Sequence, residues 1–213
     1  MNALEQVLKY KVIVIVRGLS SEHMLPFAKA LFAGGIRLME VTFDQQHQDT
    51  WPDTAYAIRA VREEYDGQMT VGAGTVLTQR QLEIARLAGA MYMVSPNVDV
   101  SIIAEAKASG MGAFPGAMTP TEIAAAYQAG ADAVKLFPAG SLGPEYVKAV
   151  TAPLSHIPLI AVGGITEKNC ADYLEAGAIG IGVGGSIVNK AWIEAGEWDK
   201  ITAHAKAYVR AVD

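Results

Sequence analysis

The sequence predicts an α/β fold, a single (β/α)8 (TIM) barrel with an N-terminal helix, in which residues 1–213 form one domain. Three observations predict it. Short apolar runs rich in β-branched residues recur along the chain, segments with helical spacing separate them, and glycines stand just before most of the runs. With 51% apolar and 18% charged residues, a chain of 213 residues can bury one sizeable core.

Eight apolar runs are predicted to be strands. Parallel strands that are covered on both faces tolerate continuous apolar sequence, whereas half-exposed strands alternate with polar residues. In chain order the runs are 12–16, 38–42, 69–72, 91–95, 112–115, 133–137, 159–162 and 179–183. No Pro- or Ser-rich linker interrupts the series, so we expect eight βα units to close into one barrel.

The segments between the runs are predicted to be helices, because Ala, Leu and Ile recur with a helical period. Examples are 24–32, 81–87, 123–129 and 169–175. We expect residues 2–10 to form a short helix that closes the bottom of the barrel, and residues 198–212 to form the closing helix. Glycine C-caps, which adopt the left-handed conformation without steric cost, are expected before the strands. They are the Gly34-Gly35 pair, Gly89, Gly110, Gly130 and Gly177.

The competing architecture is an open doubly wound sheet. Such sheets commonly carry a Gly-rich dinucleotide-binding turn after the first strand. Here Val16 is followed by Arg17-Gly18-Leu19-Ser20, which lacks that fingerprint. The count of βα units therefore favours the barrel.

Composition argues against several classes of partner. The formal net charge is −5 and no basic stripe is present, so we expect no nucleic-acid partner. The longest apolar runs are far shorter than the roughly 20 residues of a membrane span, so we expect no membrane partner. Cys170 has no second cysteine to pair with, and the N-terminal segment lacks the layout of a signal peptide. These features predict a cytoplasmic protein.

Lys135 is the most informative residue for chemistry. It stands in an otherwise apolar predicted strand, and polar side chains near the C-terminal ends of barrel strands are the candidates for catalysis. Desolvation favours the neutral amine, which is able to attack a ketone carbonyl. The alternatives are a structural ion pair with a buried carboxylate, or an outward-facing side chain if the register is one residue off.

Glu40 has a similar position in the second predicted strand. Burial raises the pKa of a carboxyl group toward the working pH of a proton shuttle. The alternative is a carboxylate that only neutralises Lys135 or Arg17, and both roles are compatible.

Two glycine turns follow the seventh and eighth predicted strands, where barrels commonly bind phosphate. They contain Gly163-Gly164 and Gly184-Gly185-Ser186. Glycines allow backbone N–H groups to approach an oxyanion closely. The alternative is an ordinary strand exit.

Metal and serine chemistry have no sequence support. No pair of histidines has the spacing of metal ligands, and neither Ser95 nor Ser186 lies in a nucleophile elbow. The scattered histidines are His23, His47, His156 and His204. We therefore expect neither a metal nor a cofactor.

An ordered set of motifs along nearly the whole chain resembles the class I 2-keto-3-deoxy-6-phosphogluconate and 2-keto-4-hydroxyglutarate (KDPG/KHG) aldolases. The motifs are Ile15-Val16-Arg17, Ala33-Gly34-Gly35-Ile36, Met39-Glu40-Val41-Thr42, Val71-Gly72-Ala73-Gly74-Thr75-Val76, Val94-Ser95-Pro96, Phe114-Pro115-Gly116, Val134-Lys135-Leu136-Phe137-Pro138-Ala139, Val162-Gly163-Gly164-Ile165 and Gly184-Gly185-Ser186.

The resemblance implies a role for each matching residue. Lys135 forms the imine with the keto acid, and Glu40 moves protons. Arg17 and Thr75 hold the pyruvate-derived part of the substrate. The remaining substrate-binding residues, with the phosphate site among them, are Pro96, Phe137, Gly163, Gly164, Gly184, Gly185 and Ser186.

The implied reaction splits such a keto acid, the small-molecule partner, into pyruvate and glyceraldehyde 3-phosphate or glyoxylate. The resemblance also implies a homotrimer without metal or cofactor, in carbohydrate metabolism of the Entner-Doudoroff type. Two alternatives from the residues alone are a barrel isomerase or decarboxylase that acts on a sugar phosphate without an imine, and a non-catalytic phosphosugar-binding protein.

The chain departs from the family pattern at two positions. Many relatives have a carboxylate-binding arginine shortly after the Glu-Val-Thr motif, where this chain has Phe43-Asp44-Gln45. The usual threonine before the first glycine pair is Val162 here, which removes a hydroxyl group near the substrate. These changes bear on carboxylate binding, on stereochemical preference and on phosphate dependence.

Overall fold

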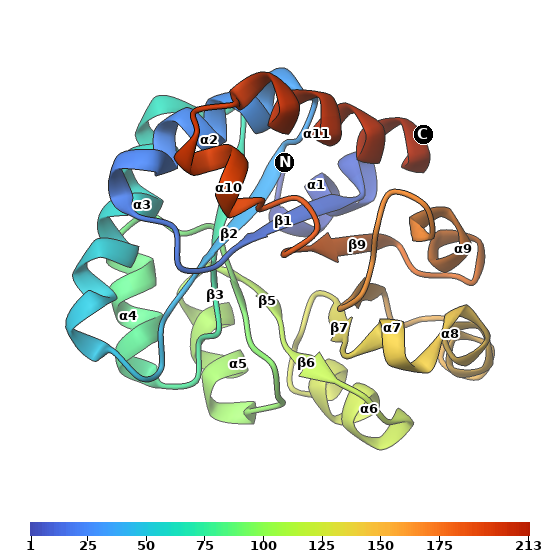
Figure 1. Ribbon diagram of the computed structural model, residues 1–213. Coiled ribbons are helices and arrows are strands. Elements are labelled where there is room, and N and C mark those ends of the chain that lie inside the picture. Colours follow the sequence, from blue (N-terminus) through green and yellow to red (C-terminus); the bar gives the residue numbers. More distant parts are fainter.

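The computed structural model describes residues 1–213 and shows a barrel of parallel strands inside a ring of helices (Figure 1). The sheet has nine strands in the order β5-β4-β3-β2-β1-β9-β8-β7-β6. The strands are β1 (Val12–Val16), β2 (Leu38–Thr42), β3 (Thr70–Gly74), β4 (Tyr92–Val94), β5 (Gly112–Phe114), β6 (Gly116–Ala117), β7 (Val134–Leu136), β8 (Leu159–Val162) and β9 (Gly180–Val183). The predicted barrel is confirmed.

The helices alternate with the strands as predicted. They are α1 (Ala3–Tyr10), α2 (Ser21–Ala33), η1 (Gln48–Thr50), α3 (Trp51–Glu64), α4 (Gln79–Leu87), α5 (Val100–Ala108), α6 (Pro120–Gln128), α7 (Ala139–Leu142), α8 (Pro144–Thr151), α9 (Cys170–Glu175), α10 (Lys190–Glu194) and α11 (Trp198–Val212). Of the predicted cap glycines, Gly35, Gly89, Gly110, Gly130 and Gly177 have positive φ angles, between 76° and 108°. Gly34, which caps α2, stays right-handed with a φ angle of −81°. None of the helices combines the length and the apolar character that crossing a bilayer requires.

The fifth predicted strand, 112–115, is wrong in its extent. It divides into β5 and β6 around Pro115, which has no N–H to donate to the ladder. The carbonyl group of Pro115 still accepts from the Lys135 N–H, at 2.9 Å. Because β5 and β6 are the two ends of the sheet order and neighbours in the chain, this segment closes the barrel.

The barrel interior is filled from below by α1, as predicted. Ala3 and Val7 of this helix join the interior apolar cluster that includes Ile13, Tyr92 and Phe114. A Cβ atom on Gly180 would lie 2.8 Å from a methyl carbon of Val7, so glycine is required where the helix meets the barrel floor. The bottom is therefore closed, and polar side chains reach the interior from the opposite end.

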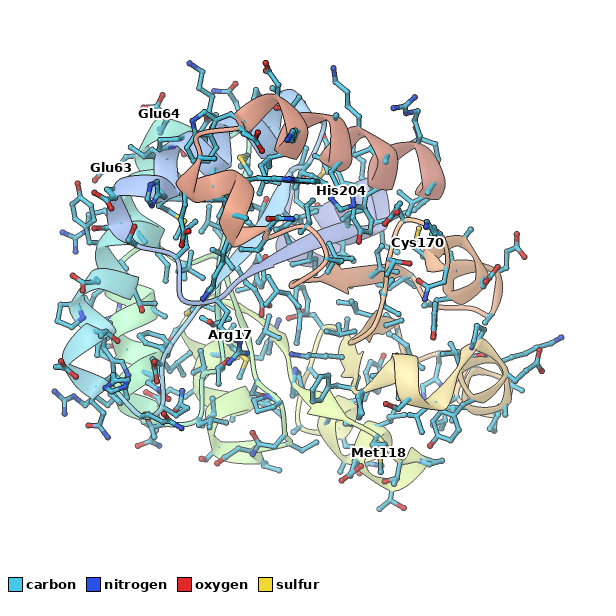
Figure 2. All side chains as sticks on the ribbon, viewed as in Figure 1. Arg17, Glu63, Glu64, Met118, Cys170 and His204 are labelled. Carbon is cyan, nitrogen blue, oxygen red and sulfur yellow. The ribbon has the colours of Figure 1, made fainter.

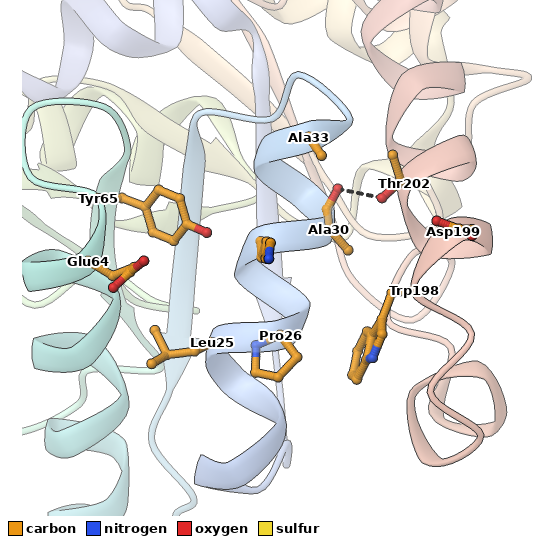
Figure 3. Close-up of a pocket in the computed structure, with 10 residues that line it drawn as sticks. Leu25, Pro26, Ala30, Ala33, Glu64, Tyr65, Trp198, Asp199 and Thr202 are labelled. Carbon is orange, nitrogen blue, oxygen red and sulfur yellow. Dashed lines mark hydrogen bonds between the residues drawn. The ribbon is translucent and has the colours of Figure 1, made fainter.

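The larger core cluster lies between the strands and the helices. Helix α11 closes this layer by packing against α2, where Thr202 donates a hydrogen bond of 3.0 Å to the Ala30 carbonyl oxygen (Figure 3). Tyr65 and Trp198 lie on opposite sides of α2 in this groove on the outer surface. The predicted closing helix, 198–212, matches α11 in its bounds.

Candidate active site

Lys135 and Glu40 point into the same cavity at the centre of the barrel. Lys135 comes from the middle of β7 and Glu40 from the middle of β2, and the two residues are 9% and 2% exposed. Apolar residues form the rest of the wall: Ile13, Ile15, Val94, Phe114, Ile160, Val162 and Gly182. The outward-facing alternative for Lys135 is therefore wrong.

Burial shifts both groups away from their charged forms. The pKa of the Glu40 carboxyl group is raised, because desolvation outweighs the opposing charges of Lys135 and Arg17. The pKa of the Lys135 amine is lowered by desolvation, against the charge of Glu40 and with a smaller contribution from Arg17 in the same direction. Both shifts make the uncharged forms of the two groups easier to reach than they are in water.

Lys135 forms no ion pair. No carboxylate oxygen lies within 4.0 Å of its Nζ atom, so the structural ion-pair alternative has no support. The ring of Phe137 lies beside the amine, with its centroid 5.1 Å from Nζ. Phe137 itself is 38% exposed and directly follows β7, the strand that carries Lys135.

Arg17 and Thr75 meet at the open end of the barrel. The Nη2 atom of Arg17 lies 3.3 Å from the Thr75 hydroxyl oxygen, and Figure 2 shows Arg17 near the barrel axis. Thr75 has a φ angle of 57°, a strained value for a residue other than glycine. Its conformation aims the hydroxyl group at the guanidinium, which supplies a cation beside the Lys135 cavity.

Two glutamines hold this strained turn. Gln45 donates a hydrogen bond of 2.9 Å to the Thr75 carbonyl oxygen and accepts one of 3.0 Å from Gln81. Gln81 is fully buried and also caps α4 through the Thr78 N–H. Neither glutamine was predicted from the sequence, because their partners are distant in the chain; the only local signal was the Thr78-to-Gln81 capping spacing.

The two glycine turns after β8 and β9 present free backbone donors. The N–H groups of Gly163, Gly164, Gly184, Gly185 and Ser186 donate to no acceptor in the protein. A Cβ atom on Gly185 would meet nothing within 4 Å, so this turn is open on its outer side. Unpaired N–H groups of this kind bind oxyanions.

The backbone of Pro96, the remaining predicted residue, packs against Gly116 of β6. A Cβ atom on Gly116 would lie 2.5 Å from the Pro96 carbonyl carbon, so the loop after β4 packs directly on the broken strand. The Pro96 side chain is exposed at the open end of the barrel. Lys135 and Glu40 thus share the central cavity, with Phe137 against the amine. Arg17 with Thr75, the two glycine turns and Pro96 follow the C-terminal ends of the strands around it.

Comparison with known proteins identifies the family. Residues 4–204 match the family model described as "KDPG and KHG aldolase". The chain belongs to this family. It is 33% identical over 205 residues to the 2-dehydro-3-deoxy-6-phosphogalactonate aldolase of Escherichia coli, covering 96% of this chain and 97% of the relative. It is 35% identical over 213 residues to the 2-dehydro-3-deoxy-phosphogluconate aldolase of Treponema pallidum, with 99% and 96% coverage.

Solved structures agree with the family assignment. A KDPG aldolase from Legionella pneumophila, with pyruvate captured as a covalent carbinolamine, has a TM-score of 0.84 at 27% identity and 98% coverage of both chains. These KDPG and KHG aldolase relatives confirm the predicted class I aldolase, a carbon–carbon lyase, and do not favour an isomerase or decarboxylase.

Proposed function

We propose that this aldolase forms its imine on Lys135, uses Glu40 as the proton shuttle, and cleaves a 2-keto-3-deoxy-6-phospho sugar acid to pyruvate and glyceraldehyde 3-phosphate. The observation that carries the proposal is the cavity shared by Lys135 and Glu40, where the amine has no ion-pair partner and its pKa is lowered. Such an amine is an activated nucleophile toward a ketone.

The first half of the reaction builds an electron sink. The neutral Lys135 amine adds to the C2 carbonyl carbon, and Glu40 supplies the proton with which the resulting hydroxyl leaves as water. The product is a protonated imine, whose positive nitrogen accepts electrons from the neighbouring bond. The apolar walls of the cavity exclude bulk water, which would stabilise the ammonium form of the lysine.

The second half breaks the C3–C4 bond. Glu40, now ionised, removes the proton of the C4 hydroxyl group directly or through a water, and the electrons of the C3–C4 bond move to the imine nitrogen. The aldehyde leaves, and an enamine of pyruvate remains on Lys135. Glu40 returns its proton to C3, and water hydrolyses the imine to release pyruvate.

The carboxylate and phosphate ends of the substrate are assigned to the Arg17–Thr75 pair and to the glycine turns, respectively. Arg17, held by Thr75, is placed to bind the carboxylate, since it is the one arginine that acts on both Lys135 and Glu40. The free N–H groups of the glycine turns are placed to bind the phosphate. Gln45 occupies the region where many relatives have an arginine, and here it holds the Thr75 turn instead.

The C4 configuration is proposed to be that of the galactonate series. Val162 is 5% exposed and lines the cavity with Lys135 and Glu40, so this wall offers the C4 hydroxyl no hydrogen bond. Two curated relatives carry galactonate names: the Escherichia coli aldolase, and a probable 2-dehydro-3-deoxy-6-phosphogalactonate aldolase of Rhizobium meliloti that is 38% identical over 176 residues. A 2-keto-4-hydroxyglutarate-type substrate, which has no phosphate, is the secondary candidate.

We further propose a cytoplasmic homotrimer in which residues 1–213 form one aldolase domain. The family resemblance supports the trimer, and light scattering coupled to gel filtration measures it directly. A monomeric mass would contradict it.

Product analysis tests the proposed reaction. The wild-type protein is incubated with 2-keto-3-deoxy-6-phosphogalactonate, and pyruvate is followed with lactate dehydrogenase. We expect pyruvate and glyceraldehyde 3-phosphate in equal amounts, and only the background rate in Lys135→Met. An isomerase would release no pyruvate, and a Lys135→Met protein with wild-type turnover would overturn the assignment of the lysine.

A further inference from the structure

Tyr208 on α11 contacts the glycine turn after β9 from outside the barrel. Its hydroxyl group donates a hydrogen bond of 2.7 Å to the Ser186 hydroxyl oxygen. Tyr208 is fully buried, and burial raises the pKa of its phenol, so it remains protonated and acts as a donor. The contact joins the last helix of the chain to the turn that is assigned to phosphate.

Ser186 in turn links the two glycine turns. Its hydroxyl group lies 3.3 Å from the carbonyl oxygen of Ile165, the residue that follows Gly163-Gly164. This distance is long for a hydrogen bond between oxygens, whose usual length is about 2.7–2.8 Å. The bond from Tyr208 is therefore the strong one, and the proton of Ser186 is only weakly held by Ile165.

A hydroxyl group has one proton to donate and two lone pairs that accept. Because Tyr208 occupies a lone pair of Ser186, the serine proton must point elsewhere, and Ile165 is its single acceptor within the protein. A phosphate oxygen beside the free N–H groups of Gly184, Gly185 and Ser186 would compete well for that proton. The bond from Tyr208 also polarises the serine hydroxyl and strengthens it as a donor.

The position of α11 explains how the tyrosine is fixed. The ring of Tyr208 packs against that of His204, with centroids 5.2 Å apart, and His204 Nε2 lies 3.3 Å from a Glu167 carboxylate oxygen. Glu167 belongs to the segment between the first glycine turn and α9. Tyr208 therefore contacts Ser186 of the second turn directly, and the segment after the first turn through His204 and Glu167. Figure 2 shows His204 on the inner face of α11.

We propose that Tyr208 is a positioning residue for phosphate recognition, which orients the Ser186 hydroxyl group as a donor to the substrate phosphate. This inference rests on the proposed function of the glycine turns. It assigns to α11, which contributes nothing to the Lys135 cavity, a specific effect on the binding of phosphorylated substrates.

The test compares Tyr208→Phe, Ser186→Ala and the double variant in steady-state cleavage of 2-keto-3-deoxy-6-phosphogalactonate and its unphosphorylated counterpart. We expect Tyr208→Phe to raise KM for the phosphorylated substrate about five-fold with little change in kcat, as for loss of one polarising hydrogen bond. Ser186→Ala should raise it about ten-fold or more, and the double variant should resemble Ser186→Ala alone, because both changes act on one hydroxyl group. For Tyr208→Phe, KM for the unphosphorylated substrate should stay at the wild-type value.

Two further measurements separate this inference from its premises. Tyr65 is another buried tyrosine outside the barrel, and it lies on the opposite side of α2 from α11 (Figure 3). Tyr65→Phe removes its hydroxyl group and should leave both KM values unchanged. Borohydride trapping of pyruvate on Lys135 reports the aldolase chemistry without any phosphate, and should persist in Tyr208→Phe. The role of Tyr208 is overturned if Tyr208→Phe leaves KM unchanged, raises it equally for both substrates, or adds its effect to that of Ser186→Ala. If borohydride trapping persists in that case, the aldolase function stands.

Discussion

Gly74 lies against the carboxylate of Glu40. A Cβ atom at Gly74 would be 2.5 Å from Oε1 of Glu40 and 2.8 Å from Cγ2 of Thr42. Gly74 ends β3 and Glu40 lies in the neighbouring strand β2, where Thr42 is the register partner of Gly74. Glycine at this position therefore provides the space in which the Glu40 side chain reaches the cavity.

The first prediction concerns this space. Gly74→Ala forces the Glu40 carboxylate to move, and a displacement of about 1 Å in a catalytic group costs on the order of 100-fold in rate. We expect kcat for the retro-aldol reaction to fall by at least that factor, while the far-ultraviolet circular dichroism spectrum keeps its native shape. A folded Gly74→Ala protein with wild-type kcat would show that Glu40 does not need this position.

The second prediction concerns the charges around Lys135. Glu40 raises the pKa of Lys135 and Arg17 lowers it, although burial dominates. Removing the carboxylate in Glu40→Gln should therefore lower the pKa of Lys135 further, and removing the guanidinium in Arg17→Gln should raise it. The neutral amine would then appear at lower pH in Glu40→Gln and at higher pH in Arg17→Gln than in the wild type.

Reductive methylation of Lys135, followed by peptide mass spectrometry across a pH series, measures these midpoints without requiring turnover. Exposed Lys206 serves as the internal reference in every variant. Midpoints that move in the same direction in both variants would contradict the electrostatic account of the site.

The third prediction concerns the buried glutamine under the Thr75 turn. Gln81→Leu breaks the hydrogen bonds to Gln45 and to the Leu77 and Thr78 N–H groups, and the part-buried Leu77 donor loses its acceptor. The free energy of unfolding in urea should fall by about 2–3 kcal/mol. Exposed Gln79→Leu on the same helix is the matched control and should change it by no more than about 0.5 kcal/mol. Equal effects of the two substitutions would refute the role of this network.

The fourth prediction concerns stereochemistry. Val162→Thr restores a hydroxyl group to the cavity wall with almost no change in volume. We expect kcat/KM for 2-keto-3-deoxy-6-phosphogluconate to increase relative to its galactonate epimer by about ten-fold, the value of one hydrogen bond to the C4 hydroxyl. An unchanged ratio would show that Val162 does not contribute to the choice between epimers.

Local sequence patterns predicted the repeating part of the fold. Continuous apolar runs located the strands, and glycine caps located most of the helix ends, because both signals depend on neighbours within a few residues. The register of β7 was left open by the sequence, with an outward-facing Lys135 as the alternative, and the structure decides it for the inward position. Pro115 was read as a strand end, although the chain resumes pairing at Gly116.

Contacts between distant segments were not predictable from these patterns. Tyr208 meets Ser186 only because α11 closes the helical ring, and Gln45 meets Gln81 and Thr75 only because neighbouring loops fold together at the open end. Tyr208 stands in no motif, and the only local signal of Gln81 is its capping spacing with Thr78. Their roles follow from three-dimensional packing, which one sequence does not specify residue by residue.

The central claim is that the amine of Lys135 bonds covalently to the ketone of the substrate. Incubation with pyruvate and sodium borohydride, followed by proteolysis and peptide mass spectrometry, tests it most directly. We predict one reduced pyruvyl adduct per chain, located on Lys135 and absent from Lys135→Arg. An adduct on another lysine of the wild-type protein, or no adduct at all, would contradict the account.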